Sequence, residues 1–147
     1  MNTDYILRLL EHLAAAITAI RSAREGGRLE EARREIASRC LEQTGLPLEL
    51  VLHLPVDHLE VLLAASGHLR VQRTLWLGEL LAEHGDLDLR FGNPPAAAMA
   101  FARSRRLLDS ILADLGADEQ THVSRRLHEL SIRLGDFDPA PLEEPPA

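Results

Sequence analysis

The segment Leu77-Gly78-Glu79-Leu80-Leu81-Ala82-Glu83-His84-Gly85 decides the fold. Gly78 lies inside an otherwise helical apolar pattern, and Gly85, seven residues later, is expected to end that helix. Because glycine within a helix costs up to about 1 kcal/mol relative to alanine, its presence at 78 indicates that another helix approaches closely there. The segment therefore predicts helices that pack in pairs, as hairpins.

The composition points to the same fold class. The chain has 147 residues, of which 46% are apolar and only 3% aromatic, with leucine and alanine dominant. Strands are enriched in aromatic and β-branched residues, and no segment alternates with a period of two for long enough to indicate one. We therefore expect an all-α protein of about six helices, plus one short helix, in antiparallel hairpins. Its length predicts a single domain.

Glycine and proline residues set the expected boundaries of the helices. Gly26-Gly27 and Gly45 are expected to end the first two helices, and the first break makes those helices an antiparallel hairpin. Further helices are expected at 47–53, 55–66, 68–84, 95–115 and from Asp118 to Gly135, with a turn-rich connection at 85–94. Residues 1–135 then form the helical domain, and the Pro/Glu-rich segment 136–147 is expected to be a flexible tail. The predicted core of the helix at 95–115 consists of Met99, Phe101, Leu108, Ile111 and Leu112.

The net charge, the cysteine count and the absence of targeting signals limit the classes of function that we expect. The formal net charge of −7 disfavours general binding of nucleic acids, which depends on neutralising phosphates. The single cysteine, Cys40, is expected to be buried and excludes an intramolecular disulfide. The N-terminus lacks the pattern of a signal peptide, and no apolar run is long enough to span a bilayer. A cytoplasmic location without a membrane partner is therefore expected.

Two segments resemble the tetratricopeptide repeat, a helix–turn–helix unit of about 34 residues. Leu77 and Gly78 match the adjacent Leu-Gly of its first helix, Gly85 matches its turn, and Ala97 and Phe101 match its second helix after an insertion. The other segment, at 7–44, contains the turn-like and helical sequence Gly27-Arg28-Leu29-Glu30-Glu31-Ala32. The chain also resembles a family of small bacterial all-helical proteins of unknown function that begin with a similar helix. The resemblance implies an interaction module and supplies no catalytic residues.

The sequence contains no convincing catalytic or cofactor motif. No serine lies between glycines in the pattern of a nucleophile elbow. Gly26-Gly27 lacks the lysine of a phosphate-binding loop. Of the seven histidines, His122 forms one Glu-x-x-His motif with Glu119, whereas a di-iron bundle needs two such motifs and two further carboxylates. We therefore expect no catalytic residues, no cofactor and no metal ligands. A helical bundle with a His/carboxylate site for a metal or small ligand is the alternative.

Six residues form the candidate interaction surface. Trp76 is expected either to pack against a neighbouring helix or to anchor a partner, because tryptophan is enriched at interfaces. The arginines of the last two long helices would make one basic face if those helices are neighbours; otherwise they are solvated and paired with nearby acids. These arginines are Arg103, Arg105, Arg106, Arg125 and Arg126.

A non-enzymatic protein-binding module or adaptor is the function that the sequence favours. Its partner is expected to be another protein or a second copy of the chain, because a short array of hairpins without polar caps favours self-association. A homodimer is therefore predicted. A regulatory protein that contacts nucleic acid through the arginine face is a further alternative.

Overall fold

The computed structural model describes the backbone of residues 3–137 and, within them, the side chains of residues 8–135. The described chain contains helices and no strands, as predicted, so the fold is all-α. It comprises seven α-helices and two short 3-10 turns. They are α1 (Thr3–Glu25), α2 (Leu29–Thr44), α3 (Leu48–His53), α4 (Val56–Ala64), η1 (Gly67–Leu69), α5 (Arg70–Arg90), α6 (Pro94–Ile111), η2 (Leu112–Asp114) and α7 (Ala117–Phe137).

Glycine ends the first two helices as the sequence predicts. Gly27 follows α1 with a φ of 81°, and Gly45 follows α2 with a φ of 76°, a left-handed conformation that glycine adopts without steric cost. The amide of Gly45 donates to the carbonyl of Leu41, which closes the last turn of α2. α1 and α2 therefore form the predicted antiparallel hairpin.

The prediction that Gly85 ends its helix is wrong. α5 continues through Gly85 to Arg90, so the expected connection at 85–94 shrinks to residues 91–93. Asn93 then caps α6 by accepting a hydrogen bond from the amide of Ala96. Gly85 is therefore not the residue that ends α5. It lies within the helix, where it packs against Phe101 of α6.

Both glycines of α5 face α6. A Cβ atom on Gly78 would lie 2.5 Å from Cδ2 of Leu108, and one on Gly85 would lie 2.4 Å from Cε1 of Phe101. Real Cβ atoms essentially never show contacts this short, so a side chain at either position would force Leu108, Phe101 or the helices themselves to shift. Ser104 lies between those two α6 residues, and its hydroxyl donates to the carbonyl of Gly78 over 2.6 Å. The close helix approach inferred from Gly78 is therefore confirmed.

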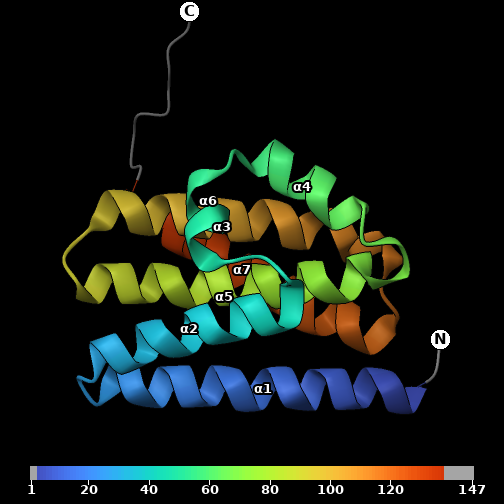
Figure 1. Cartoon of the computed structure of the whole chain (residues 1–147), viewed down its shortest axis with the longest axis horizontal. Helices are drawn as coiled ribbons and strands as arrows, with labels where there is room; N and C mark the ends of the chain where they lie inside the picture. The colour runs from blue at the N-terminus through green and yellow to red at the C-terminus, as the bar shows by residue number, and fades with distance from the viewer. Residues whose placement is uncertain (1–2, 138–147) are drawn as a thin grey trace, which may run out of the picture.

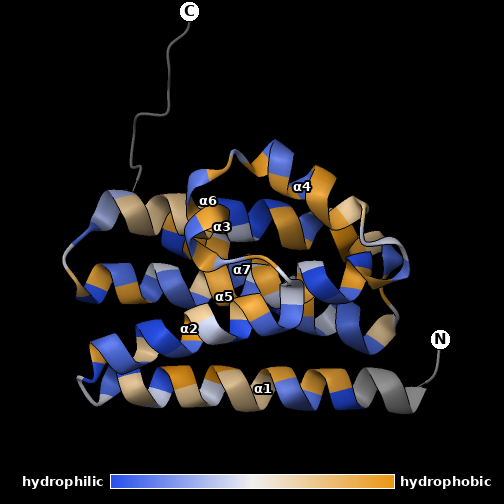
Figure 2. Cartoon of the chain, viewed as in Figure 1, coloured by the Kyte–Doolittle hydropathy of each residue, from blue (hydrophilic) through white to orange (hydrophobic). Residues whose placement is uncertain are grey.

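The central helix is α5, which lies between α2 and α6 in Figure 1 and also contacts α1 and α4. Every residue from Thr74 to Gly85 is buried. Along the other helices hydrophilic and hydrophobic segments alternate, as amphipathic helices require (Figure 2). Within the described chain, α5 is thus the helix on which α1, α2, α4 and α6 pack.

Most of the predicted core is buried, but Leu112 is only half-buried against it and Met99 is exposed. Cys40, Phe101, Leu108 and Ile111 are buried as expected. Met99 is 57% exposed because it lies on the side of α6 that faces away from α5, so its assignment to the core is wrong. On α4, Leu59 and Leu63 are buried, whereas the neighbouring Val61 and Leu62 are exposed.

α7 ends two residues later than the sequence indicates. Gly135 lies inside the helix, which continues to Phe137. Residues 138–147 of the expected tail lie outside the described residues. Among residues 3–137, moreover, we find no helix with the combined length and apolarity needed to cross a membrane.

Candidate functional site

The predicted basic face across α6 and α7 is not formed, although the two helices are neighbours. Arg103 donates from Nη1 to the carbonyl oxygens of Val51, at 2.9 Å, and Leu54, and so ties the end of α3 to α6. Burial lowers the pKa of Arg103. Arg103 therefore closes the C-terminus of a helix and is not part of an open basic patch.

The other predicted arginines also separate. Arg106 pairs with Asp57 and with Glu60 of α4, its Nη2 lying 3.0 Å from Oε1 of Glu60. Arg126 is buried among carboxylates. Arg105 and Arg125 are exposed and make no hydrogen bond or ion pair with a described residue. Of the five predicted arginines, Arg105 and Arg125 are thus the two without a partner among the described residues.

Trp76 is 1% exposed and lies in the core. Of its two expected roles, packing against neighbouring helices is therefore the one that its position supports. Its Nε1 atom is buried without a hydrogen-bond partner among the described residues, as is Oε1 of Gln72 one turn earlier. Trp76 is accordingly not on the surface of the single chain.

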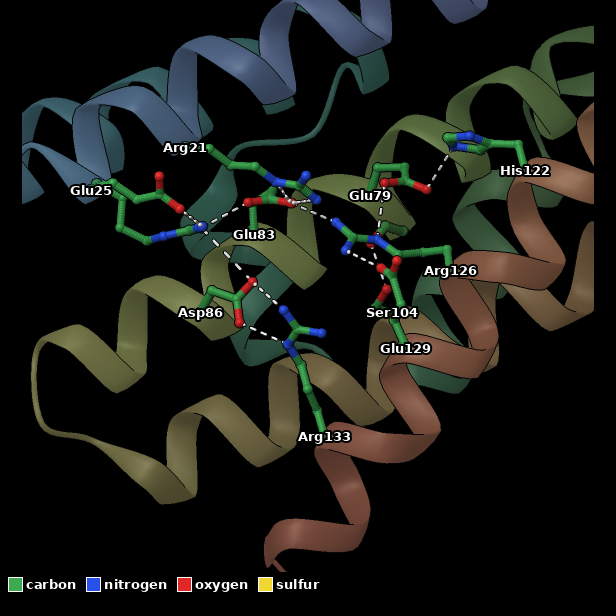
Figure 3. Close-up of polar contacts among 12 residues, drawn as sticks. Arg21, Glu25, Glu79, Glu83, Asp86, Ser104, His122, Arg126, Glu129 and Arg133 are labelled. Carbon is green, nitrogen blue, oxygen red and sulfur yellow. Dashed lines mark hydrogen bonds and ion pairs between the residues drawn. The ribbon is translucent and has the colours of Figure 1, made fainter.

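The largest polar feature is a cluster of charged residues between α1, α5 and α7 (Figure 3). We call it the ionic cluster. α5 supplies three carboxylates, and α1 and α7 supply the arginines that surround them. Its members are Arg21, Arg24, Glu79, Glu83, Asp86, His122, Arg126, Glu129 and Arg133.

Glu83 is the centre of the ionic cluster. Its side chain is 0% exposed, and it accepts hydrogen bonds from three arginines. Oε1 lies 2.8 Å from Nη1 of Arg24, while Oε2 accepts from Nε and Nη2 of Arg21 and, at 2.6 Å, from Nη2 of Arg126. Burial alone raises the pKa of Glu83, but the hydrogen bond from Arg21 and the nearby charges outweigh it, so the pKa lies below its ordinary value. Glu83 is therefore ionised and joins α1 and α7 to the central helix.

Arg126 is held by three carboxylates at once. Its Nε donates to Oε1 of Glu79 over 3.1 Å, its Nη1 to Glu129 over 3.2 Å, and its Nη2 to Glu83. Burial lowers the pKa of Arg126, but the charges of Glu79 and Glu83 more than compensate and raise it. Asp86 extends the cluster by accepting from Arg133 over 2.9 Å. Arg126, which the sequence analysis placed on a candidate interaction surface, is thus buried inside the protein.

The acid sensitivity of folding follows from Glu83. A carboxylate whose pKa is lower in the folded state contributes stability above its ordinary pKa of 4.5 and loses that contribution as the pH falls through the folded value. We therefore predict that the free energy of unfolding decreases more steeply below pH 4.5 for the wild type than for Glu83→Gln, which cannot titrate at that position. Urea titrations across pH 3–7 measure both slopes, and equal slopes would contradict the prediction.

Sequence reasoning missed the carboxylates of the ionic cluster. Glu79, Glu83 and Asp86 recur at spacings of four and three, so they share one face of α5. That spacing is visible in the sequence, but a charged stripe on a helix ordinarily indicates a solvated face. Only the arrangement of α1 and α7 shows that the stripe is covered.

The histidines do not gather into a metal site in the described part of the chain. His122 does not pair with Glu119; its Nε2 instead lies 3.2 Å from Oε2 of Glu79. His84 contacts Asp88 on the same helix, at 3.0 Å. No group of three or more histidine, cysteine, aspartate or glutamate side chains among the described residues is placed to hold a metal ion.

A second surface feature is an apolar groove of about 410 Å³ between α2 and α3. We call it the α2–α3 groove. Leu41, which is 55% exposed, lies along it, and charged side chains of α2 and α3 line its rim. Its apolar lining consists of Ala37, Leu41, Pro47, Leu48 and Leu52, and its rim of Glu30, Arg33, Arg34 and Glu49.

The charges at the rim of the α2–α3 groove are unevenly satisfied. On α2 and its N-cap, Arg28 pairs with Glu31, and Arg39 pairs with Glu35 and Glu42. Arg33 and Arg34 make no hydrogen bond or ion pair with a described residue. The groove therefore combines an apolar floor with a charged rim on which Arg33, Arg34 and Glu30 have no partner among the described residues, while Glu49 lies 3.8 Å from His53.

Comparison with known proteins assigns no family to this arrangement. No protein-family model matches the chain, and searches of curated proteins and of solved structures give no significant match.

Proposed function

We propose that the chain is a non-enzymatic protein-binding module that takes an amphipathic helix of a partner protein into the α2–α3 groove. The observation that carries the proposal is the exposed Leu41 in an apolar groove beside two arginines that pair with no residue in the described part of the chain. Short helical segments commonly bind in such grooves through apolar side chains on successive turns. The tetratricopeptide-like character and the cytoplasmic location expected from the sequence belong to this proposal.

The rim determines the chemistry of the partner. Arg33 and Arg34 lack partners among the described residues, so carboxylates beside the apolar stripe of the incoming helix would form charge-assisted hydrogen bonds with them. Such pairs at a rim mainly affect orientation and the association rate, whereas the burial of Leu41 supplies affinity. The proposed occupant is therefore an amphipathic helix that carries acidic residues.

Photo-crosslinking tests the proposal. The photoreactive residue benzoylphenylalanine replaces Leu41 in one version of the chain and Ser124, an exposed residue of α7, in a matched control. In cells of the native host, we predict a discrete adduct from position 41 that is absent from position 124. The adduct should disappear when Arg33→Glu and Arg34→Glu are introduced, and the crosslinked peptide should be acidic and of helical periodicity.

Three outcomes would contradict the proposal. They are equal adducts from both positions, an adduct that survives the charge reversal, and an adduct whose mass is twice that of the chain. The last would replace the helical partner with a second copy of the chain, which is the homodimer expected from the sequence. Circular dichroism of the charge-reversed variant verifies that it is folded.

A further inference from the structure

A separate cavity of about 240 Å³ lies over the ionic cluster, between α1 and α7. We call it the α1–α7 groove. Glu79 and Arg126 line it, and Leu13 and Ile17 of α1 provide apolar lining. Its volume is below the about 300 Å³ at which pockets for drug-sized ligands begin, so a smaller molecule fits it.

The buried part of the lining is already satisfied. Both oxygens of Glu79 are engaged, one with Nε of Arg126 and the other with Nε2 of His122. Every nitrogen of the Arg126 guanidinium donates to a carboxylate. These two residues therefore offer little to a ligand, and recognition has to come from side chains nearer the opening.

The unused hydrogen-bonding groups nearer the opening are mainly donors. Arg125 makes no hydrogen bond or ion pair with a described residue. Arg21 uses Nε and Nη2 on Glu83, its Nη1 has no hydrogen-bond partner among residues 8–135, and its side chain is 45% exposed. Glu129 is the one acidic lining residue with a spare oxygen, and its other oxygen is held by Arg126. Arg21 of α1 and Arg125 of α7 thus line the groove from opposite walls.

The charge of the lining is positive on an acidic protein. Three arginines and two glutamates line the groove, whereas the whole chain carries a formal charge of −7. Below the lining, Arg24 and Arg133 face Glu83 and Asp86, and the exposed Glu25 lies 3.7 Å from Arg24. One extra negative charge would neutralise the groove, while a second would be repelled by Glu129.

We infer that the α1–α7 groove binds a small organic monocarboxylate, with the carboxylate held between Arg125 and Arg21 and its apolar part against Leu13 and Ile17. The guanidinium of Arg125 has no partner among the described residues, and a guanidinium can bind a carboxylate through two parallel hydrogen bonds. The apolar part removes water from the groove and strengthens those bonds. This site is distinct from the α2–α3 groove, and its test does not depend on the proposed function.

Titration with sodium hexanoate, monitored by nuclear magnetic resonance and calorimetry, tests the inference. We expect saturable shifts of the amide signals of α1 and α7 around Ile17 and Arg125, with a dissociation constant of about 1 mM. The variant Arg125→Gln should weaken binding about tenfold, because it removes a charge-assisted pair of hydrogen bonds. The matched control, Arg105→Gln, removes another exposed arginine that pairs with no described residue, and it should leave the affinity unchanged.

Two further probes separate the contributions of charge and apolar contact. 1-Hexanol has the chain without the charge, and inorganic phosphate has charge without the chain, so both should bind more weakly than hexanoate. The inference is overturned if hexanoate gives no saturable shifts, if either probe binds as tightly as hexanoate, or if Arg125→Gln and Arg105→Gln behave alike. Both substitutions are at exposed positions, and circular dichroism verifies that the variants are folded.

Discussion

Replacing Glu83 with glutamine is expected to destabilise the fold by about 3 kcal/mol, because it leaves buried arginines without their shared anion. The side chains of Arg24 and Arg126 are only 10% and 4% exposed, so water cannot replace the carboxylate. Arg21 is 45% exposed and can turn outward, which keeps the loss at the lower end of the range for a broken buried ion pair. Urea unfolding followed by circular dichroism at pH 7 measures the change.

A matched control distinguishes burial from the ion pair itself. Glu35 also accepts a hydrogen bond from an arginine at 2.8 Å, but it lies on the surface of α2 with Arg39. Surface pairs contribute about 0.2–1 kcal/mol, so Glu35→Gln should have a small effect. If the two glutamine variants lose similar stability, the ionic cluster is not the link between the helices that we describe.

A double-mutant cycle tests whether Glu83 and Arg126 act together. Arg126→Met removes the cation but leaves Glu79 with a weaker partner, so it is also destabilising. In the Glu83→Gln variant, Arg126 has already lost one of its carboxylate partners, so Arg126→Met costs less there than in the wild type. The combined loss should therefore be smaller than the sum of the single losses, by about 1–3 kcal/mol. Additive losses would contradict direct coupling.

The helical fold was predictable because its signals are local. The boundaries at Gly27 and Gly45 depend on a backbone conformation that only a few residue types adopt, so they are visible in the sequence. The burial of Cys40, Phe101 and Leu108 follows from apolar spacing in the same way.

The failures of sequence reasoning concern contacts between distant segments. Whether Gly85 ends α5 or packs inside it depends on Phe101, which is sixteen residues away. The position of Arg126 depends on carboxylates 43 and 47 residues earlier in the chain. Neither dependence leaves a periodic pattern, and a glutamate stripe such as Glu79 and Glu83 indicates a solvated face until the covering helices are placed.

Replacing Gly85 with alanine is expected to destabilise the protein by about 1–3 kcal/mol, although alanine is the better helix former. The added methyl group would lie 2.4, 2.6 and 2.9 Å from three atoms of the Phe101 ring, which is itself 0% exposed. A buried planar ring cannot give way as the end of a flexible side chain can, so α5 and α6 must separate. Thermal and urea unfolding measure the loss.

Gly135 supplies the control, since it lies inside α7 and a methyl group added there would meet no described neighbour within 4 Å. Gly135→Ala should stabilise the protein by up to about 1 kcal/mol through helix propensity alone. The same substitution therefore has opposite signs at two helical glycines, and only the position of a neighbouring helix distinguishes them. Combining Gly85→Ala with Phe101→Leu removes the ring and should recover part of the cost of the glycine substitution, relative to Phe101→Leu alone. Stabilisation by Gly85→Ala, or a cost that persists unchanged without the ring, would show that α5 does not need glycine to approach α6.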